Sequence, residues 1–299
     1  MTLQQLKYVV TVAECGNITE AAKQLFVSQP TVTSAIHDLE KEMQIVIFVR
    51  TNKGVILSED GERFLGHARQ VLEQVDLIEG IYKNDVVSKP HFAVSCQHYS
   101  FAVNAFVDVI RRFDAYQYDF TIREEQTHEI IEDVTNLKSE LGVIYLSSKN
   151  TEVLSKMLKR NELEFTELFT ATPHVFICDS HPLAKKKRIT MEDLQDYPYL
   201  TYEQGEYNSQ YFSEEFVSTL DSRKNIRVRD RATLFNLIIG LNGYTVCSGV
   251  ISAELNGRNI ISKPLDVEEY MQIGIITRKG VVLSRYAREY IEALKAHCM

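Results

Sequence analysis

The sequence predicts an α/β protein with three consecutive parts: a small helical module that ends in a two-stranded wing, one long helix, and a large domain of two lobes. Three observations lead to this prediction. Helix-start signals recur within the first 30 residues, an apolar seam then runs along a proline-free stretch, and strand patterns alternate with helical patterns from there to the C-terminus. We expect the three parts to cover residues 1–58, 59–88 and 89–299.

Composition excludes several classes of protein. The 299 residues are 44% hydrophobic and 25% charged, which is ordinary for a soluble globular protein. Residues 1–20 do not resemble a signal peptide, and no stretch approaches the roughly 20 apolar residues of a membrane helix. We therefore expect a cytoplasmic protein that does not contact membranes. Five widely spaced cysteines without a CxxC pair argue against a disulfide framework and against a zinc site.

Charge does not indicate a nucleic-acid partner. The net charge of the chain is −8, and the first 60 residues contain five basic and seven acidic side chains. The basic surface that usually identifies a DNA-binding protein is therefore missing from the sequence. Any argument for DNA binding has to rest on geometry.

The N-terminal module begins with three expected helices. The first covers residues 2–14, and Gly16 ends it. A short helix begins at Thr19. The segment Ser28-Gln29-Pro30 then begins a helix over about 29–42, because serine can cap a helix and proline is tolerated in the first turn.

This third helix has two different faces. Its apolar residues step by four, three and four positions and form one buried stripe: Val32, Ile36, Leu39 and Met43. The opposite face is short and polar: Pro30, Thr33, Ser34, His37 and Lys41. Hydrogen-bonding side chains of this kind can read base edges in the major groove. A short helix, a tight turn and a helix exposed in this way predict a helix-turn-helix.

A hairpin is expected directly after it. Residues 45–50 and 55–57 have β-like composition, and the turn between them contains a glycine and a cation. As a wing, this hairpin could place Arg50 and Lys53 against the DNA backbone or minor groove. The residues themselves fit an ordinary exposed hairpin equally well.

Longer strings in this region resemble a known family. AAKQLFVSQPTVTSAIHDLEKEM, followed by FVRTNKGVILSEDG, is similar to the DNA-binding region of LysR-type regulators. The resemblance implies a transcriptional regulator rather than an enzyme, with double-stranded DNA and RNA polymerase as partners. It implies base contacts by Gln29, Pro30, Thr33 and Ser34 and a wing contact by Arg50, and to these we add Thr31, His37 and Lys53. Many family members have basic residues where this chain has Ser34 and His37, so we expect weaker non-specific binding.

The stretch from Glu59 to about Val87 is expected to form one helix. Its apolar residues repeat at alternating steps of four and three, as in a coiled coil: Phe64, Ala68, Val71, Val75, Ile78 and Tyr82. Such a seam needs a partner, which could be its own domain. The resemblance implies pairing with a second subunit, giving a homodimer, or a homotetramer if the C-terminal domains also pair.

Beyond residue 89 strands and helices alternate, which predicts an α/β domain. Strands are expected at 91–96, 119–124, 141–146, 175–178, 199–201, 226–228, 244–247 and 265–276. Helices are expected at 100–113, 128–138, 191–195, 231–241 and 284–296. Crossings near 161 and 266 divide the domain into lobe I (89–161 and 266–299) and lobe II (162–265). The string HPLAKKKRITMEDLQDYPYLTY resembles the type 2 periplasmic-binding-protein-like effector domain of the LysR family, and its basic run 185–188 is interpreted as a solvated loop.

In a bilobed domain the ligand is expected in the cleft, where strands end and helices begin. Helix N-termini there suit a carboxylate or a sulfate. The candidates for binding a small-molecule effector are Ser95, Gln97, His98, Thr127, Thr201 and Tyr202. Each of them could serve instead as a helix cap or a loop contact. We expect no cofactor and no metal, because His98 has no histidine or cysteine partners at ligand spacing.

Three further strings narrow the resemblance. FAVSCQHYSFAVNAFV, TYEQGEYNSQYFSEE and DRATLFNLIIGLNGYTVCSG resemble a Gram-positive branch of the family whose regulators are associated with methionine and cysteine metabolism and with transport. This implies a small sulfur-containing or amino-acid-related effector. The sequence leaves open which metabolite it is, which genes are regulated, and whether they are activated or repressed.

Other functions were weighed against this interpretation. The chain contains no GxSxG, GxGxxG, Walker or HExxH motif. Its acidic pairs, Glu124-Glu125 and Glu214-Glu215, are expected on the solvated surface. A solute-binding transport protein is excluded by the missing export signal and by the DNA-binding module. A thiol redox switch remains an alternative, because Cys96 and Cys247 each end an expected strand that could border the cleft.

Overall fold

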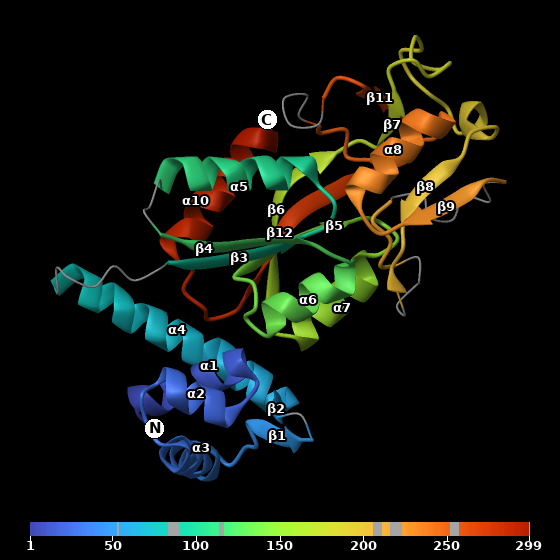
Figure 1. The fold of residues 1–299 in the computed structure, drawn as a ribbon. Coiled ribbons are helices and arrows are strands. Elements are labelled where there is room, and N and C mark those ends of the chain that lie inside the picture. Colours follow the sequence, from blue (N-terminus) through green and yellow to red (C-terminus); the bar gives the residue numbers. More distant parts are fainter. Residues whose placement is uncertain are drawn as a thin grey trace. The chain divides into compact units, whose positions relative to one another are not determined.

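The computed structural model describes residues 1–52, 54–82, 90–113, 117–205, 211–215, 223–251 and 257–298 (Figure 1). The chain divides into two compact units. The first contains Met1–Pro90, with which the segment Asn136–Lys138 groups, and the second contains His91–Thr135 and Ser139–Met299. Each unit has its own hydrophobic core. No helix among the described residues is long and apolar enough to span a bilayer.

Three helices open the first unit as the sequence predicted: α1 (Leu3–Cys15), α2 (Ile18–Gln24) and α3 (Gln29–Met43). Thr2 and Gln5 form a capping box at the start of α1. The Asn17 side chain caps α2, which begins one residue earlier than expected. The Ser28 side chain accepts a hydrogen bond from the Thr31 N–H and so caps α3.

The predicted stripe of α3 is buried except at its end. Val32, Ile36 and Leu39 are buried, but Met43 is 41% exposed, so the prediction was wrong there. The reason is that α3 ends at this residue. Gln44 follows in the left-handed conformation, with φ of 57°, and turns the chain away from the core.

The wing is formed by β1 (Phe48–Thr51) and β2 (Gly54–Leu57), paired antiparallel. We expected the first strand to begin at residue 45, but residues 45–47 lie outside it. The Glu40 carboxylate accepts hydrogen bonds from the backbone N–H groups of Ile47 (2.7 Å) and Phe48 (3.1 Å). Because the Ile47 N–H is bonded to α3, it does not pair with a strand. Lys53, one of the predicted DNA contacts, lies outside the described residues.

The long helix, α4, covers Glu59–Tyr82. Its first turns complete the core of the unit, where Leu65 and Ala68 are buried. Further along, two seam residues are exposed: Val71 and Ile78, the latter by 57%. Residues 83–89, the expected end of this helix, lie outside the described residues, as does the side chain of Tyr82.

A five-stranded sheet forms lobe I of the second unit. Its strand order is β4 (Asp119–Glu124), β3 (His91–Cys96), β5 (Leu141–Leu146), β12 (Met271–Arg278) and β6 (Leu163–Ala171). One face is covered by α5 (Ser100–Phe113) and α10 (Arg285–Cys298), and the other by α6 (Thr127–Thr135) and α7 (Thr151–Arg160), as Figure 1 shows. The strands β3, β4 and β5 run parallel, so their carboxyl ends meet at one edge.

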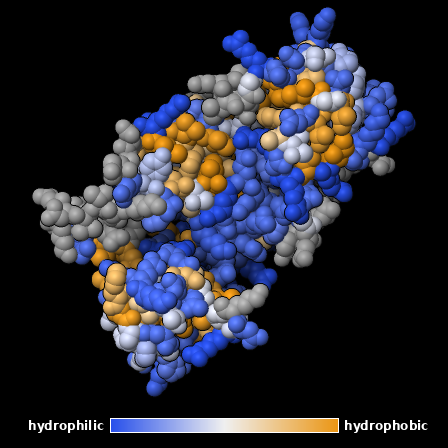
Figure 2. All heavy atoms as spheres, viewed as in Figure 1, coloured by the Kyte–Doolittle hydropathy of each residue, from blue (hydrophilic) through white to orange (hydrophobic). Residues whose placement is uncertain are grey.

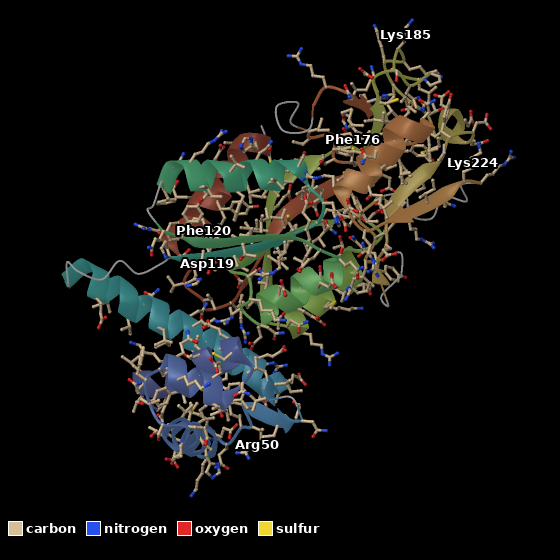
Figure 3. The ribbon with its side chains drawn as sticks, viewed as in Figure 1. Arg50, Asp119, Phe120, Phe176, Lys185 and Lys224 are labelled. Carbon is tan, nitrogen blue, oxygen red and sulfur yellow. The ribbon has the colours of Figure 1, made fainter. Side chains whose placement is uncertain are left out.

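Lobe II is built around β7 (His174–Cys178). The strands β10 (Thr245–Cys247) and β11 (Ile260–Pro264) pair with it on either side. A parallel pair, β8 (Tyr199–Tyr202) and β9 (Asn225–Val228), joins through a bridge between Tyr199 and Tyr244. The short helix η1 (Glu192–Leu194) and the helix α8 (Arg231–Leu241) complete the lobe. The basic run 185–188 is exposed as expected, and Figure 3 labels Lys185 at the end of this lobe.

Several boundaries in the second unit differ from those expected. The strand β6 was assigned to lobe II, but it pairs with β12 in the sheet of lobe I, so the first crossing comes after residue 171 instead of near 161. Of the long strand expected at 265–276, only the part from Met271 onward is a strand, β12 in lobe I; the strand β11, which ends at Pro264 in lobe II, was not predicted. The helix α7 was not predicted at all. The helix α6 ends at Thr135 rather than at residue 138, just before Leu137, whose φ is 57°.

Replacing Glu40 with alanine should loosen the first unit. The change removes the acceptor for two backbone N–H groups, and hydrogen bonds to a charged group stabilise a fold by about 1.5–3 kcal/mol. We expect faster hydrogen–deuterium exchange in peptides that cover the end of α3 and the wing. The matched control is Asp38→Ala, an exposed acid on the same helix. Equal exchange in the two variants would contradict the role of Glu40.

Candidate DNA-binding groove and effector cavities

A groove of about 610 Å³ runs between α3 and the wing in the first unit. Six of the eight predicted DNA contacts line it: Gln29, Pro30, Thr33, Ser34, His37 and Arg50. Figure 3 labels Arg50 on the wing. Thr31 does not line the groove; its hydroxyl pairs with that of Ser28 at 2.7 Å. The groove therefore gathers polar side chains from the start of α3 with one wing cation.

The first turn of α3 holds these side chains in place. The amide Nε2 of Gln29 donates a hydrogen bond to the Thr33 hydroxyl one turn later, at 2.7 Å. An amide of this kind offers a donor and an acceptor together, which matches the major-groove edge of adenine. Arg50 adds a cation at the opposite wall, where a phosphate or the minor groove would lie.

In the second unit, three of the six predicted effector residues are buried and bonded to the protein itself. The hydroxyl of Ser95 bonds to Asp133 at 2.8 Å and to Ser139 at 2.9 Å. The amide of Gln97 donates to the Thr127 hydroxyl at 2.7 Å and accepts from the Tyr145 N–H. These side chains form two polar clusters within the unit, and none of them lines either of the two cavities described below.

The structure does bring together His98, from the loop before α5, and Tyr202, from β8. Their rings stack with centroids 3.8 Å apart and planes inclined by 7°. Because His98 belongs to lobe I and Tyr202 to lobe II, this contact joins the lobes. The sixth predicted residue, Thr201, is half-buried beside Tyr202 and pairs with Arg227 in the sheet, away from both cavities.

A buried carboxylate holds His98 from the other side. Glu214 lies 2.9 Å from His98 Nδ1, accepts the His98 backbone N–H at 2.9 Å, and also accepts from the amide of Gln204. Burial by itself lowers the pKa of His98, but the charge and hydrogen bond of Glu214 outweigh it, so the pKa is raised above its ordinary value. A hydrogen-bonded histidine–carboxylate pair therefore joins the lobes.

Two cavities lie next to His98. The outer one, of about 390 Å³, has four acidic side chains in its lining: Glu124, Glu125, Glu129 and Glu203. The inner one, of about 40 Å³, lies between the start of α5, the strand β10 and the start of α8. Lobe I contributes His98, Tyr99 and Ser100 to its lining. Lobe II contributes further residues, including Tyr202, Glu214, Glu215, Arg231 and Thr245.

The acidic pairs were expected on the solvated surface, and that prediction was wrong. Glu214 and Glu215 are 6% and 2% exposed. The carboxylate of Glu124 forms an ion pair with Arg231 of lobe II at 3.0 Å. Burial raises the pKa of Glu125 to about 7, and the nearby Asp133 carboxylate contributes to this rise to a smaller extent. Adjacent acids usually mark solvent-facing surface, so nothing in the sequence distinguished these pairs.

Two sequence families match the chain. The first, described as bacterial regulatory helix-turn-helix protein of the lysR family, matches residues 3–62, and the second, the LysR substrate binding domain, matches residues 96–299. The chain belongs to the LysR family. It is a DNA-binding transcription regulator with an effector-binding domain, and it is not an enzyme.

Relatives and solved structures agree with this assignment over the whole length. The chain is 26% identical to the uncharacterised regulator YbhD of Escherichia coli, over 98% of this chain and 90% of that protein. It is 22% identical to OxyR of E. coli, over 99% of this chain and 95% of that protein. A full-length OxyR variant from Pseudomonas aeruginosa superposes with a TM-score of 0.64 at 21% identity, covering 99% and 95% of the two chains. The LysR-family regulator CbnR bound to its target DNA superposes with a TM-score of 0.57 at 18% identity, covering 99% of this chain and 100% of that chain. At these identities the structures establish the fold.

Replacing Glu215 with glutamine should stabilise this LysR-family protein at alkaline pH. Burial and Glu214 raise the pKa of Glu215 from its ordinary 4.5 to about 8. Between these two values the folded chain holds a proton that the unfolded chain has released, so stability falls as pH rises through this range. Because glutamine does not ionise, the variant does not lose stability over this pH range. Its melting temperature should exceed that of the wild type at about pH 9 by a few degrees and match it at about pH 5.

The control for this variant is Glu268→Gln, which changes an exposed carboxylate in the same unit. It should leave the melting temperature nearly unchanged at both pH values. A gain for Glu215→Gln that is the same at both pH values would contradict the raised pKa.

Proposed function

We propose that this regulator reads a specific DNA site through the groove between α3 and the wing. The observation that carries the proposal is the gathering of Gln29, Thr33, Ser34 and Arg50 around one groove. Gln29 and Thr33 would read base edges, and Arg50 would neutralise a backbone phosphate or enter the minor groove. The residues surrounding them supply little positive charge, so specificity depends on hydrogen-bond geometry more than on electrostatic attraction.

The protein binds DNA as a dimer in this proposal. Val71 and Ile78 continue the apolar seam of α4 and are exposed to solvent. Pairing of two such helices would bury the seam and present two recognition helices to a partly palindromic site. On the face drawn in Figure 2, an apolar patch lies over α8, where Ile239 and Leu241 are exposed. A second pairing there would give a tetramer.

The second unit binds a small-molecule effector between its lobes. The outer and inner cavities both adjoin His98, and residues from both lobes line them. A ligand seated there would change how closely the lobes approach each other. Through the dimer, this change would alter the spacing or bend imposed on the DNA and hence the access of RNA polymerase to the promoter.

The proposed regulon is sulfur amino-acid metabolism or transport, in the cytoplasm. Its support is the similarity of three strings around β3, β8 and α8 to the Gram-positive branch described above. The effector would then be methionine, cysteine or a related metabolite. Effector identity changes readily on one scaffold, so this assignment depends on direct binding measurements.

A thiol redox switch is the second candidate, and the names of the relatives favour it. Several are described as hydrogen peroxide-inducible genes activators. In this chain, however, burial raises the pKa of Cys96 well above its ordinary value, and burial also raises that of Cys247. Because the thiolate is the reactive form, such cysteines react slowly with peroxide. We therefore favour the metabolite sensor.

Two variants test the DNA groove. Gln29→Ala should weaken binding to a selected operator by about 1–3 kcal/mol and relax its sequence preference. Arg50→Ala should weaken all duplexes alike and lower the salt slope by about one. Fluorescence anisotropy at several salt concentrations, on duplexes selected from a random pool, measures both. The control is Arg63→Ala, an exposed arginine on α4 outside the groove. An unchanged affinity and salt slope in both groove variants would refute the assignment.

Thermal melts of the full chain against a metabolite panel test the effector. The panel contains methionine, cysteine, homocysteine and O-acetylserine. A ligand that binds only the folded state raises the melting temperature by mass action, and a thousandfold excess over its Kd is worth about 4 kcal/mol. We expect one sulfur compound to give a saturable rise that Thr245→Val, at the inner cavity, reduces and that Thr201→Ala, outside both cavities, does not. A melt that responds to oxidant but to no metabolite, with the response lost in Cys96→Ser, would favour the redox switch instead.

A further inference from the structure

The inner cavity contains two buried donors that the described part of the chain leaves without an acceptor. Among the described residues, neither Thr245 Oγ1 nor Arg231 Nη1 has a hydrogen-bond partner, and both atoms are shielded from solvent. Thr245 is 4% exposed. Buried polar groups nearly always have partners, so two donors in one cavity indicate that an acceptor belongs there.

Arg231 is held in place by its other nitrogen. It is the first residue of α8, and its Nη2 pairs with the Glu124 carboxylate at 3.0 Å. A guanidinium has donors on both terminal nitrogens in a planar fork. With Nη2 bound to Glu124, Nη1 is available to a second anion. A hydroxyl and a guanidinium in the same cavity suit a carboxylate.

The same cavity also has an acceptor with spare capacity. Glu215 accepts one hydrogen bond at each oxygen, from the Tyr202 N–H at 2.7 Å and from the Ser213 hydroxyl at 3.0 Å. A carboxylate has about four acceptor positions, so two remain. Glu214, in contrast, already accepts bonds from both His98 and Gln204. Burial and Glu214 raise the pKa of Glu215 to about 8, so the folded chain holds a proton there at neutral pH, and a bound ammonium would displace that proton to solvent.

We propose that the inner cavity binds the charged head of an α-amino acid, with the ligand carboxylate on Arg231 and Thr245 and the ligand ammonium on Glu215. This proposal rests on the proposed function, since it specifies the effector of the same domain. Only a ligand that carries both charged groups on the same carbon atom satisfies both sets of groups. A bare anion would face the carboxyl groups, and a bare amine would face Arg231.

The size of the cavity adds a consequence for signalling. Its volume of about 40 Å³ has room for a group of a few heavy atoms, such as the head, but not for a complete amino acid. The side chain of the ligand therefore has to separate Tyr202 from His98, whose stacked rings border this cavity. Binding would then move the two lobes apart at this contact, and the signal would be a change in lobe closure.

The test measures binding by isothermal titration calorimetry on the full chain. The probes are L-methionine, L-cysteine and the other common L-amino acids. For whichever of them binds, the methyl ester lacks the carboxylate and the deamino analogue lacks the ammonium. Thr245→Val removes one hydroxyl at nearly constant shape. We expect it to weaken the amino acid about tenfold to a hundredfold and to leave the affinity of the ester unchanged.

Glu215→Gln provides the complementary measurement. It should weaken binding of the amino acid but not of the deamino analogue, because only the amino acid has an ammonium group that can bind Glu215. The matched control is Thr166→Val, which removes an exposed hydroxyl from the strand β6. That variant should bind as the wild type does, and melts of all variants establish that they are folded.

Three results would overturn the proposal. The first is binding of no amino acid by the wild type. The second is an effector that lacks either charge, tested by melts with inorganic sulfate, in which case the protein remains a metabolite sensor but this inference fails. The third is an amino acid whose affinity neither Thr245→Val nor Glu215→Gln reduces. A loss of operator binding in the groove variants bears on DNA recognition and is independent of all three.

Discussion

The strand β12 is the constraint on which the second unit depends. It returns from lobe II and lies between β5 and β6, pairing antiparallel with both. At Gly274 the fit leaves no room for a side chain, because a Cβ atom would lie 2.4 Å from the Phe165 ring and 2.5 Å from the Thr166 carbonyl oxygen. Since β6 leaves lobe I and β12 re-enters it on adjacent strands, lobe II is an insertion attached by two short crossings. Relative motion of the lobes is therefore confined to these crossings.

Contacts between titratable side chains then join the two lobes. The pair formed by His98 and Glu214, and the pair formed by Glu124 and Arg231, each join one lobe to the other. Separating a buried ion pair leaves its charges without partners, which is strongly unfavourable unless a new group replaces the lost one. The proposed effector site adjoins these contacts, so a ligand bound there would be coupled to lobe closure.

The first unit solves a different problem, because it must position a DNA-reading helix with little help from charge. The Glu40 carboxylate connects α3 to the wing by bonding the backbone at Ile47 and Phe48. Gly54 of the wing packs against the α1–α2 turn, where its neighbour Val55 donates to the Gly16 carbonyl oxygen at 2.9 Å. A cation on the wing and the polar start of α3 are therefore held as one surface, so geometry can provide specificity that bulk electrostatics does not.

The sequence by itself determined the local elements whose signals are periodic or capped. The capping box of α1, the serine cap of α3 and the strands β3 and β5 needed no distant partner to be recognised. It also identified the family and six of the residues that line the groove between α3 and the wing. The tertiary structure decided which sheet each strand joins, because β6 has the same pattern whether it pairs in lobe I or in lobe II. It also decided the roles of the acidic pairs. Glu214 and Glu215 look like surface acids in sequence, and only the folding of lobe II against His98 and β8 buries them beside groups that bond to them. Burial and charge pairing are relations between distant segments, and neighbouring residues in the sequence do not contain them.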